Sequence, residues 1–451
     1  MQQISREAFS TVSVGAGQGT ETWGGSGAHP LTFGAICLEP QDVVDAYHFL
    51  VARWLVLRQQ MLDLRGGAKW NQIIHRPVFS LGGPNPNFDL IESDAWIALS
   101  KRSCTILELP PIQGRYHTVQ ILNGWGEVIA NINERTFPHH PSGRFALCLA
   151  GAEGLDIPDD ALRIDLPCSM ARMKIAIQAG PDPAQARELE MRISLRASGE
   201  VPEVAATDQT EFRYSWLLSA DCFDLAERIL ALEDVIPGKE AAKCRTLIVA
   251  AAAADSRQRR EITRIIRKFA VPPLFEPTCS YGSMRSEWMS LGRSAGAAGD
   301  YGIQAAKNLT DLWANTSDEV LTFHRHRLGG GGFVQKFSPE QNPAIVAEYG
   351  WSVTCVDSER LQPAPNLLGR HSLNSHSELE LNGDGSLELC FGPELPAGCP
   401  VSNWLPTPAG SRYNLVYRFY APFTPDYFPP PLSPLERPSL GGGPRHSAVA
   451  A

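Results

Sequence analysis

The sequence predicts a mainly β protein of the α+β class, with two β-sandwich domains and a helical segment between them. Short apolar segments alternate with Gly, Pro and Asn turns over residues 75–149, as in a sandwich. Apolar residues then recur every three or four positions over residues 219–269, which indicates helices. Short strand-like segments return at residue 320 and continue to residue 420.

The length and composition of the chain agree with this fold class. With 451 residues the chain can form two or three ordinary domains. Hydrophobic residues make up 43% and charged residues 20%, which is the composition of a globular protein rather than a disordered one. The net charge of −9 argues against a nucleic-acid partner, because proteins that wrap nucleic acid carry an excess of basic residues.

The sequence also bears on location and cofactors. Residues 1–28 are polar and rich in Gly, without the apolar core of a secretion signal. The most apolar run, residues 246–254, is far shorter than the roughly 20 residues of a membrane span. We therefore expect a cytoplasmic protein without membrane contact, whose ten cysteines are reduced. Since no two cysteines have Cys-x-x-Cys spacing, no metal and no cofactor are predicted.

Residues 36–200 are predicted to form the N-terminal β domain, after a disordered N-terminus at residues 1–35. A leading helix is expected over residues 39–61, because its apolar residues fall on one face. A second helix begins at Pro183, whose missing N–H suits a first turn, and ends near residue 195. Strands are expected at residues 95–99, 104–109, 116–122, 145–149 and 173–177.

Residues 215–335 are predicted to form a helical connecting region. Ser219 is expected to cap one helix through its side-chain oxygen. A long helix should follow over residues 239–269, and Pro272 and Pro273 should end it because proline donates no N–H.

Residues 336–424 are predicted to form the C-terminal β-sandwich domain, followed by a Pro- and Gly-rich tail at residues 425–451 without a core of its own. The clearest hairpin joins residues 378–381 to residues 386–391, because the intervening Asn-Gly-Asp-Gly is a strong turn signal. The other strands of this part of the chain are expected at residues 320–326, 333–337, 347–356 and 413–420.

Two blocks of residues resemble a known family. Residues 71–151 are similar to the domain of unknown function 1254, with the motifs Pro84-Asn85-Pro86-Asn87-Phe88-Asp89, Gly114-Arg115-Tyr116 and Trp125-Gly126. Residues 349–422 are similar to the domain of unknown function 1214, with the motifs Gly350-Trp351-Ser352, Asn403-Trp404-Leu405-Pro406 and Arg418-Phe419-Tyr420. The chain thus resembles the family in which these two domains stand in tandem.

The resemblance implies two sandwich or jelly-roll-like domains joined by helices, assembled into a homo-oligomer. It also implies a fold similar to that of bacterial peptide N-glycosidases, which motivates a carbohydrate or other small polar substrate. The sequence departs from the family in two respects. Family members often carry an export signal, and the stretch after Asp300-Tyr301-Gly302 lacks the Arg that is usual there.

The candidate site begins with three oxygen-bearing side chains at alternate positions, Asn85, Asn87 and Asp89. They are candidates for holding a sugar; the alternative is a turn in which Asn and Asp bond to their own backbone. Asp89 is the candidate general acid or base. Arg115 is the second candidate catalytic residue, and Arg418 is a candidate for binding an anionic group of the substrate. The alternative for both arginines is a structural ion pair between strands.

The second half of the candidate site is the loop at residues 403–408. Trp404, with Asn403 beside it, is a candidate for stacking on a substrate ring because it lies in a Pro-flanked loop; the alternative is core packing. His324 and His326 lie on one face of a predicted strand, as in some metal sites. No Glu ligand follows them, so a site without metal is favoured.

Two hypotheses of function follow. The first is a hydrolase that processes a glycan or small polar molecule, with its site where the loop at residues 85–89, Arg115 and the loop at residues 403–408 meet. The second is a non-catalytic carbohydrate- or ligand-binding module, or an assembly subunit. An enzyme should hold Asp89 in a cleft, whereas a module should leave it solvated.

Overall fold

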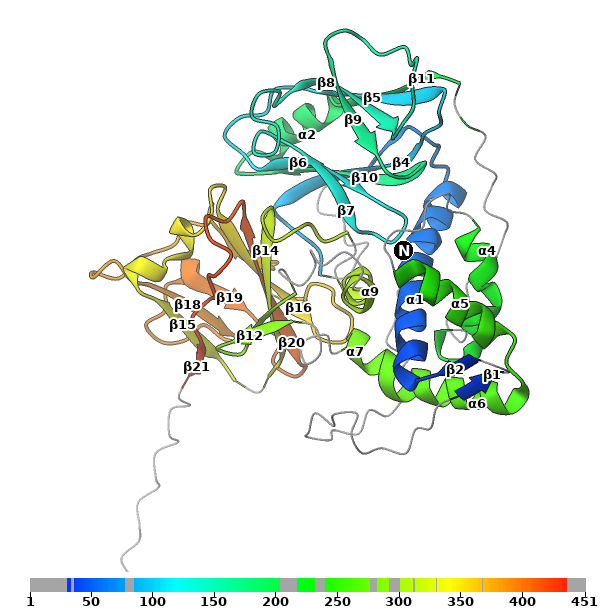
Figure 1. The fold of residues 1–451 in the computed structure, drawn as a ribbon. Helices are drawn as coiled ribbons and strands as arrows, with labels where there is room; N and C mark the ends of the chain where they lie inside the picture. Colours follow the sequence, from blue (N-terminus) through cyan, green and yellow to red (C-terminus); the bar gives the residue numbers. More distant parts are fainter. Residues whose placement is uncertain are drawn as a thin grey trace, which may run out of the picture.

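The structure is a computed structural model, and within the residues it describes the chain forms two β sandwiches and a helical unit beside them (Figure 1). The mainly β prediction is therefore confirmed. The described residues are 31–33, 36–77, 85–200, 202, 217–231, 240–275, 282–291, 301–310, 313–329, 331–366 and 368–435.

The N-terminal sandwich packs a five-stranded sheet against a four-stranded one. Its core lies between the sheets and includes Ile97, Leu107, Phe145 and Met173, all essentially without solvent exposure. The first sheet has the order β3 (Ile73–His75), β4 (Leu90–Ala98), β10 (Met170–Gln178), β6 (His117–Leu122), β7 (Val128–Ile132). The second has the order β11 (Ser194–Gly199), β5 (Ser103–Leu109), β8 (Gly143–Leu149), β9 (Ala161–Leu166).

Helix α2 (Pro183–Met191) packs against β4 and β10. Its first turn contains Pro183, as predicted, and the Asp182 side chain accepts hydrogen bonds from the amides of Ala184 and Gln185. The helix ends before residue 195 because the chain turns into β11, which pairs with β5.

The helical unit is built around the predicted leading helix, α1 (Pro40–Arg65). A reciprocal cap between Glu39 and Asp42 fixes its start. Phe49 contacts the ring of Tyr301 edge to face, with centroids 4.6 Å apart, which joins α1 to α9. No helix among the described residues has the length and apolarity that crossing a membrane requires. The other helices are α4 (Ala226–Leu230), α5 (Glu240–Ala252), α6 (Ser256–Ile265), α7 (Val271–Phe275) and α9 (Tyr301–Thr310).

Two predictions for this helical unit were wrong. The single helix at residues 239–269 is divided, because Asp255 caps a new helix by accepting from the amides of Arg257 and Gln258. Pro272 and Pro273 do not end a helix. A π-helical turn at Ile266–Ala270 leads into α7, where the prolines occupy the first turn and no N–H is required of them. Ser219 does form a cap, but of a 3-10 helix, Ala220–Leu225.

The C-terminal sandwich packs a six-stranded sheet against a four-stranded one. Phe323, Phe391, Leu405, Tyr417 and Phe419 fill the core between them. The first sheet has the order β12 (Ser283–Arg285), β13 (Trp288–Ser290), β14 (Val320–Leu328), β20 (Tyr413–Tyr420), β16 (Trp351–Asp357), β17 (Ser372–Asn374). The second has the order β19 (Trp404–Pro406), β18 (Leu387–Gly392), β15 (Phe333–Phe337), β21 (Leu432–Pro434).

The ends of the predicted C-terminal domain need correction. The turn at residues 382–385 forms, but residues 378–381 join β18 only through a bridge between Leu381 and Leu387, since β18 pairs with β15 and β19. The chain beyond residue 424 continues the domain, because β21 pairs with β15. At the N-terminus, Leu31–Phe33 (β1) pairs with Ile36–Leu38 (β2). Residues 1–30 and 436–451 lie outside the described residues.

A buried ion cluster joins α1 to the N-terminal sandwich. The Arg172 guanidinium lies 2.8 Å from Asp94 on β4 and 3.4 Å from Asp63 on α1, and the rings of Trp96 and Trp313 lie 4.9 and 3.9 Å from it. Burial alone raises the pKa of Asp94, but the charges of Arg172 and Arg76, with a hydrogen bond from Arg76, outweigh burial and lower it. Buried charges thus hold α1 of the helical unit to the five-stranded sheet of the N-terminal sandwich.

Replacing Arg172 with Ala should reduce the free energy of unfolding by up to about 3–5 kcal/mol, because it removes the more deeply buried of the two arginines that Asp63 and Asp94 share and leaves them only the partly exposed Arg76. Urea unfolding followed by tryptophan fluorescence measures the loss. Arg102→Ala is the control, since the Arg102–Glu200 pair is exposed and its removal should change stability by less than about 1 kcal/mol. Equal losses in the two variants would contradict the role of the cluster.

Candidate functional site

The loop at residues 85–89 contacts the outer face of the C-terminal sandwich. The Arg418 guanidinium donates a 2.6 Å bond to the backbone oxygen of Asn85, 333 positions away in the chain. The Tyr420 hydroxyl donates to Asp89 Oδ2 at 2.9 Å, and the Asn374 amide donates to Asp89 Oδ1 at 3.0 Å. The structure therefore brings the predicted Asn85–Asp89 segment together with Arg418, from opposite ends of the chain.

The same segment also forms the alternative turn. Asn87 Oδ1 accepts from the amide of Asp89 at 2.8 Å, and Asn85 has a positive φ of 49°, which asparagine tolerates better than most residues. Asn87 Nδ2 lies 3.0 Å from the Tyr420 oxygen. The turn thus presents Asp89 to β20, where its side chain is only 6% exposed.

Asp89 serves as an acceptor at this interface. Both of its carboxylate oxygens receive hydrogen bonds from uncharged donors, Tyr420 and Asn374. Burial and the charge of Asp89 place the pKa of Tyr420 well above its usual value, so the hydroxyl keeps its proton and remains a donor. These contacts favour a positioning role for Asp89 over the acid or base role.

Three predicted site residues lie elsewhere. Arg115 Nη1 donates to the backbone oxygens of Gln178 and Ala179, at the end of β10, and its other nitrogen contacts Gln185 on α2. Trp404 begins β19 of the four-stranded sheet, and Asn403 ends the 3-10 helix just before it, Val401–Asn403. Their described side-chain hydrogen bonds stay within the C-terminal domain.

Trp404 is separated from the Asn85–Asp89 loop because the two lie on different sheets of the C-terminal sandwich. Trp404 Nε1 donates to the oxygen of Gly392 at 2.9 Å, and β19 pairs in parallel with β18. The loop instead contacts β20 and β17 of the six-stranded sheet. The apolar core, including Leu405 and Phe419, lies between the two sheets. The two predicted halves of the site therefore do not share a cavity.

The outer face of the six-stranded sheet carries polar side chains beside Arg418. Leu415, Tyr417 and Phe419 face the core, so the alternate residues of β20 face outward. The register pairs Arg418 with Ser352 on β16, and pairs Val416 with both His324 on β14 and Thr354 on β16. Directly opposite residues lie close together on one face. We call Arg418, Ser352, Thr354 and His324 the outer-face cluster.

Each member of the outer-face cluster has a buried polar atom without a partner among the described residues. These atoms are Arg418 Nη1, Ser352 Oγ, Thr354 Oγ1 and His324 Nδ1. The residues are 4%, 0%, 0% and 6% exposed, respectively. A buried polar group without a hydrogen bond costs about 1–3 kcal/mol, so four neighbouring ones are an unusual feature of a folded protein.

His324 is neutral at physiological pH. Burial, then the nearby ring of His326, then Arg418 lower its pKa well below the usual value. The two histidine rings are parallel, with centroids 5.5 Å apart. Within the described residues no group of three or more His, Cys, Asp and Glu side chains is placed to hold a metal ion.

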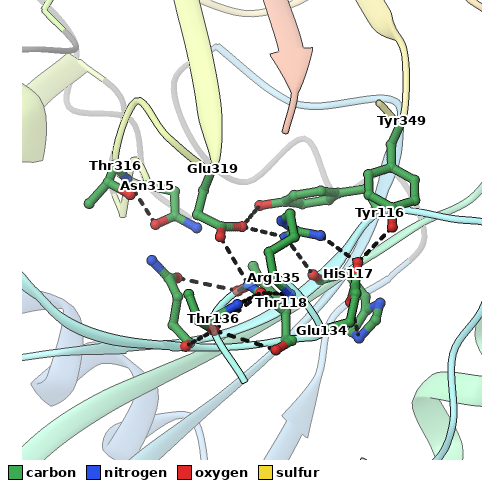
Figure 2. Close-up of polar contacts among 12 residues, drawn as sticks. Tyr116, His117, Thr118, Glu134, Arg135, Thr136, Asn315, Thr316, Glu319 and Tyr349 are labelled. Carbon is green, nitrogen blue, oxygen red and sulfur yellow. Dashed lines mark hydrogen bonds and ion pairs between the residues drawn. The ribbon is translucent and has the colours of Figure 1, made fainter. Parts of the chain in front are cut away.

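A second polar group at the domain interface holds its arginine between two carboxylates (Figure 2). We call it the Arg135 cluster. The Arg135 guanidinium lies 2.5 Å from Glu319, just before β14, and 2.6 Å from Glu134. The hydroxyls of Tyr116 and Tyr349 donate to Glu319 and Glu134, and both rings lie next to the Arg135 guanidinium. These ion pairs join the N-terminal domain to the segment that leads into β14, although Arg135 Nε has no hydrogen-bond partner among the described residues.

Comparison with known families matches both domains. The model of the protein family of unknown function DUF1254 matches residues 70–197, and that of DUF1214 matches residues 329–424. The chain carries a DUF1254 domain followed by a DUF1214 domain. The resemblance recognised in the sequence is therefore confirmed, and the two family domains correspond to the two sandwiches.

A solved structure shares the fold of this DUF1254/DUF1214 protein. The crystal structure of the VPA0106 protein from Vibrio parahaemolyticus is 16% identical with a TM-score of 0.60, and the alignment covers 88% of this chain and 100% of that one. At this identity the likeness shows the fold alone. An uncharacterised protein from Burkholderia cenocepacia is 12% identical with a TM-score of 0.42, over 86% and 93% of the chains. A search of curated proteins gave no significant match.

Sequence reasoning missed most of the outer-face cluster in this DUF1254/DUF1214 protein. Ser352 and Thr354 alternate with the apolar residues of β16, which is an ordinary strand pattern. Only the register with β20 shows that they flank Arg418, and register cannot be read from one strand. His324 was considered only as a metal ligand.

Replacing Asp89 with Asn should lower the free energy of unfolding by about 1–3 kcal/mol, because one amide hydrogen then faces a donor, Tyr420 or Asn374. Chemical denaturation of the full chain measures this. Asp159→Asn, at an exposed position, is the control and should have little effect. A D89N protein as stable as D159N would show that the loop is not held to β20 by these bonds.

The free energy of unfolding should fall as the pH is lowered, because of His324. Its pKa is lower in the folded state than in the unfolded state, so the unfolded chain takes up the proton first and stability is lost as pH drops below about 6.5. Between pH 7.5 and 5.5 the wild type should lose about 1.4 kcal/mol more than His324→Gln. Urea denaturation at the two pH values measures the difference, with His376→Gln at an exposed position as control. Identical losses in wild type and H324Q would refute the contribution of His324 to this pH dependence.

Proposed function

We propose that this protein binds a small polar molecule between its two β domains, on the outer face of the six-stranded sheet. One observation carries the proposal, namely four buried polar atoms at neighbouring register positions that have no hydrogen-bond partner in the part of the chain that the structure describes. Buried polar groups in folded proteins are satisfied, and a set left unsatisfied together calls for a partner. A small molecule with several polar atoms is such a partner.

The surroundings of the outer-face cluster support this proposal. The Asn85–Asp89 turn covers Arg418 from the other domain, and ligand sites are common between domains. Thr322, opposite Arg418 on β14, and His326 are partly exposed, so the cluster borders solvent along β14. In this proposal Asn87 and Asp89 hold the turn in place, and Arg418 contacts the ligand.

Hydrolysis of the bound molecule is the second candidate function, and His324 is the observation that favours it. Asp89 is a weak candidate for the base because both of its oxygens accept hydrogen bonds. His324 is uncharged and its Nδ1 has no partner among the described residues, so the ring nitrogen can accept a hydrogen bond from a water molecule and orient it. The sequence resemblance to peptide N-glycosidases adds glycans to the substrates worth testing.

The binding proposal predicts a selective effect of Thr354→Val, which keeps the shape of the side chain and removes its hydroxyl. Small polar probes (acetate, phosphate, glycine, glycerol, glucose and N-acetylglucosamine) are tested by the rise in melting temperature of the wild type. At least one should raise it, and T354V should lose most of the rise while the unliganded variant melts no lower than wild type.

Thr105→Val is the matched control. Thr105 is also fully buried, and its hydroxyl has no partner among the residues that the structure describes, but it lies on β5 in the N-terminal domain. T105V should respond to each probe as the wild type does. A probe response that is the same in T354V as in T105V places binding away from the outer-face cluster and rejects the proposal.

A further inference from the structure

We infer that the molecule bound at the outer-face cluster is a small anion, a carboxylate or another oxyanion, whose negative group contacts Arg418 and the hydroxyls of Ser352 and Thr354. This inference rests on the function proposed above and adds the chemical class of the ligand. It follows from the charges and from the balance of donors and acceptors on this face of the sheet.

Arg418 is a buried cation with an open donor. Its Nη2 donates to the backbone oxygen of Asn85, whereas Nη1 is buried and has no acceptor among the described residues. The described carboxylates all lie beyond ion-pair distance from its guanidinium. A guanidinium in a protein always carries its charge and accepts no hydrogen bonds, so only an acceptor can satisfy Nη1. An anion supplies the acceptor and the missing charge together.

Asp89, the carboxylate nearest in this arrangement, does not fill that role. Its two oxygens accept from Tyr420 and Asn374. Asp89 raises the pKa of Tyr420 and Arg418 lowers it, so both charges act on this hydroxyl. Because both oxygens of Asp89 accept from other donors, Arg418 Nη1 keeps no acceptor among the described residues.

The neighbours of Arg418 add donors. Ser352 lies directly opposite Arg418 on β16, and Thr354 lies two residues farther along the same face. Each hydroxyl donates one hydrogen bond, so a group with two or three oxygen atoms can bridge Nη1 and the hydroxyls. His324 pairs with Val416 on the neighbouring strand and is uncharged, so it does not repel an anion. Its Nδ1 is a further polar atom that the ligand can contact.

The charge of Arg418 also argues against a neutral sugar. The hydroxyls of Ser352 and Thr354 donate and accept, so they can bind either kind of ligand, whereas Arg418 Nη1 only donates. The oxygens of Asp89 and Asn87 are used within the interface, by Tyr420, Asn374 and the Asp89 amide. A buried permanent cation without a carboxylate partner among the described residues favours an anionic acceptor.

The test compares anionic with neutral probes on the full chain. Sodium acetate, sodium pyruvate and sodium phosphate are titrated against glycerol and glucose, with ionic strength matched by sodium chloride, and binding is followed by calorimetry. At least one of the anions should bind saturably, whereas the neutral probes should not. Thr354→Val should weaken the affinity for the anion by about tenfold, the equivalent of one good hydrogen bond.

Arg418→Gln should abolish anion binding, and Arg102→Gln, at an exposed arginine, should not change it. Because R418Q also loses the bond to Asn85, its fold is checked by circular dichroism, and the T354V result stands independently of it. Anion binding that survives T354V unchanged would overturn the inference.

The outcomes separate this inference from the proposed function. If glycerol or glucose binds in a Thr354-dependent manner and the anions do not, the ligand class is wrong and the binding site stands. If neither kind of probe binds in a Thr354-dependent manner, the ligand class and the proposed site both fail.

Discussion

The arrangement of this molecule depends on strand β20, because its two faces belong to different interfaces. Leu415, Tyr417 and Phe419 build the core of the C-terminal sandwich, while Arg418 and Tyr420 bond to the Asn85–Asp89 turn of the N-terminal domain. A change of register by one residue would exchange these faces. The alternation of the strand therefore fixes both the core and the junction between the domains.

The features that the sequence predicted are those encoded by local patterns. The leading helix, the strands at residues 104–109 and 333–337, and β20 follow from periodicity alone. Asn85, Asn87, Asp89 and Arg418 were recognised as polar residues in unusual positions, and they do meet. Trp404 was placed wrongly because a Pro-flanked loop has the same appearance whichever sheet it joins. Its sheet is set by the parallel pairing of β19 with β18, a long-range contact.

The domain interface contains two sets of polar residues with similar composition and different bonding. In the Arg135 cluster the arginine faces two glutamates, each of which also accepts from a tyrosine hydroxyl (Figure 2). In the outer-face cluster the arginine has one backbone acceptor and no carboxylate partner among the described residues. Residue types alone would rank the first set higher as a catalytic site. The charge balance reverses that order for binding an anion, because the charge of Arg135 is compensated by glutamates and that of Arg418 is not.

Burial has opposite consequences for the two basic residues of the outer-face cluster. It removes the charge of His324, whose pKa falls, but it cannot remove the charge of Arg418, which stays protonated in any protein environment. The site therefore pairs one permanent cation, suited to holding a negative group, with one neutral base. Binding uses only the cation, whereas hydrolysis also needs a scissile bond and a water molecule within reach of the imidazole. The two candidate functions thus share Arg418 and differ only in the use of His324.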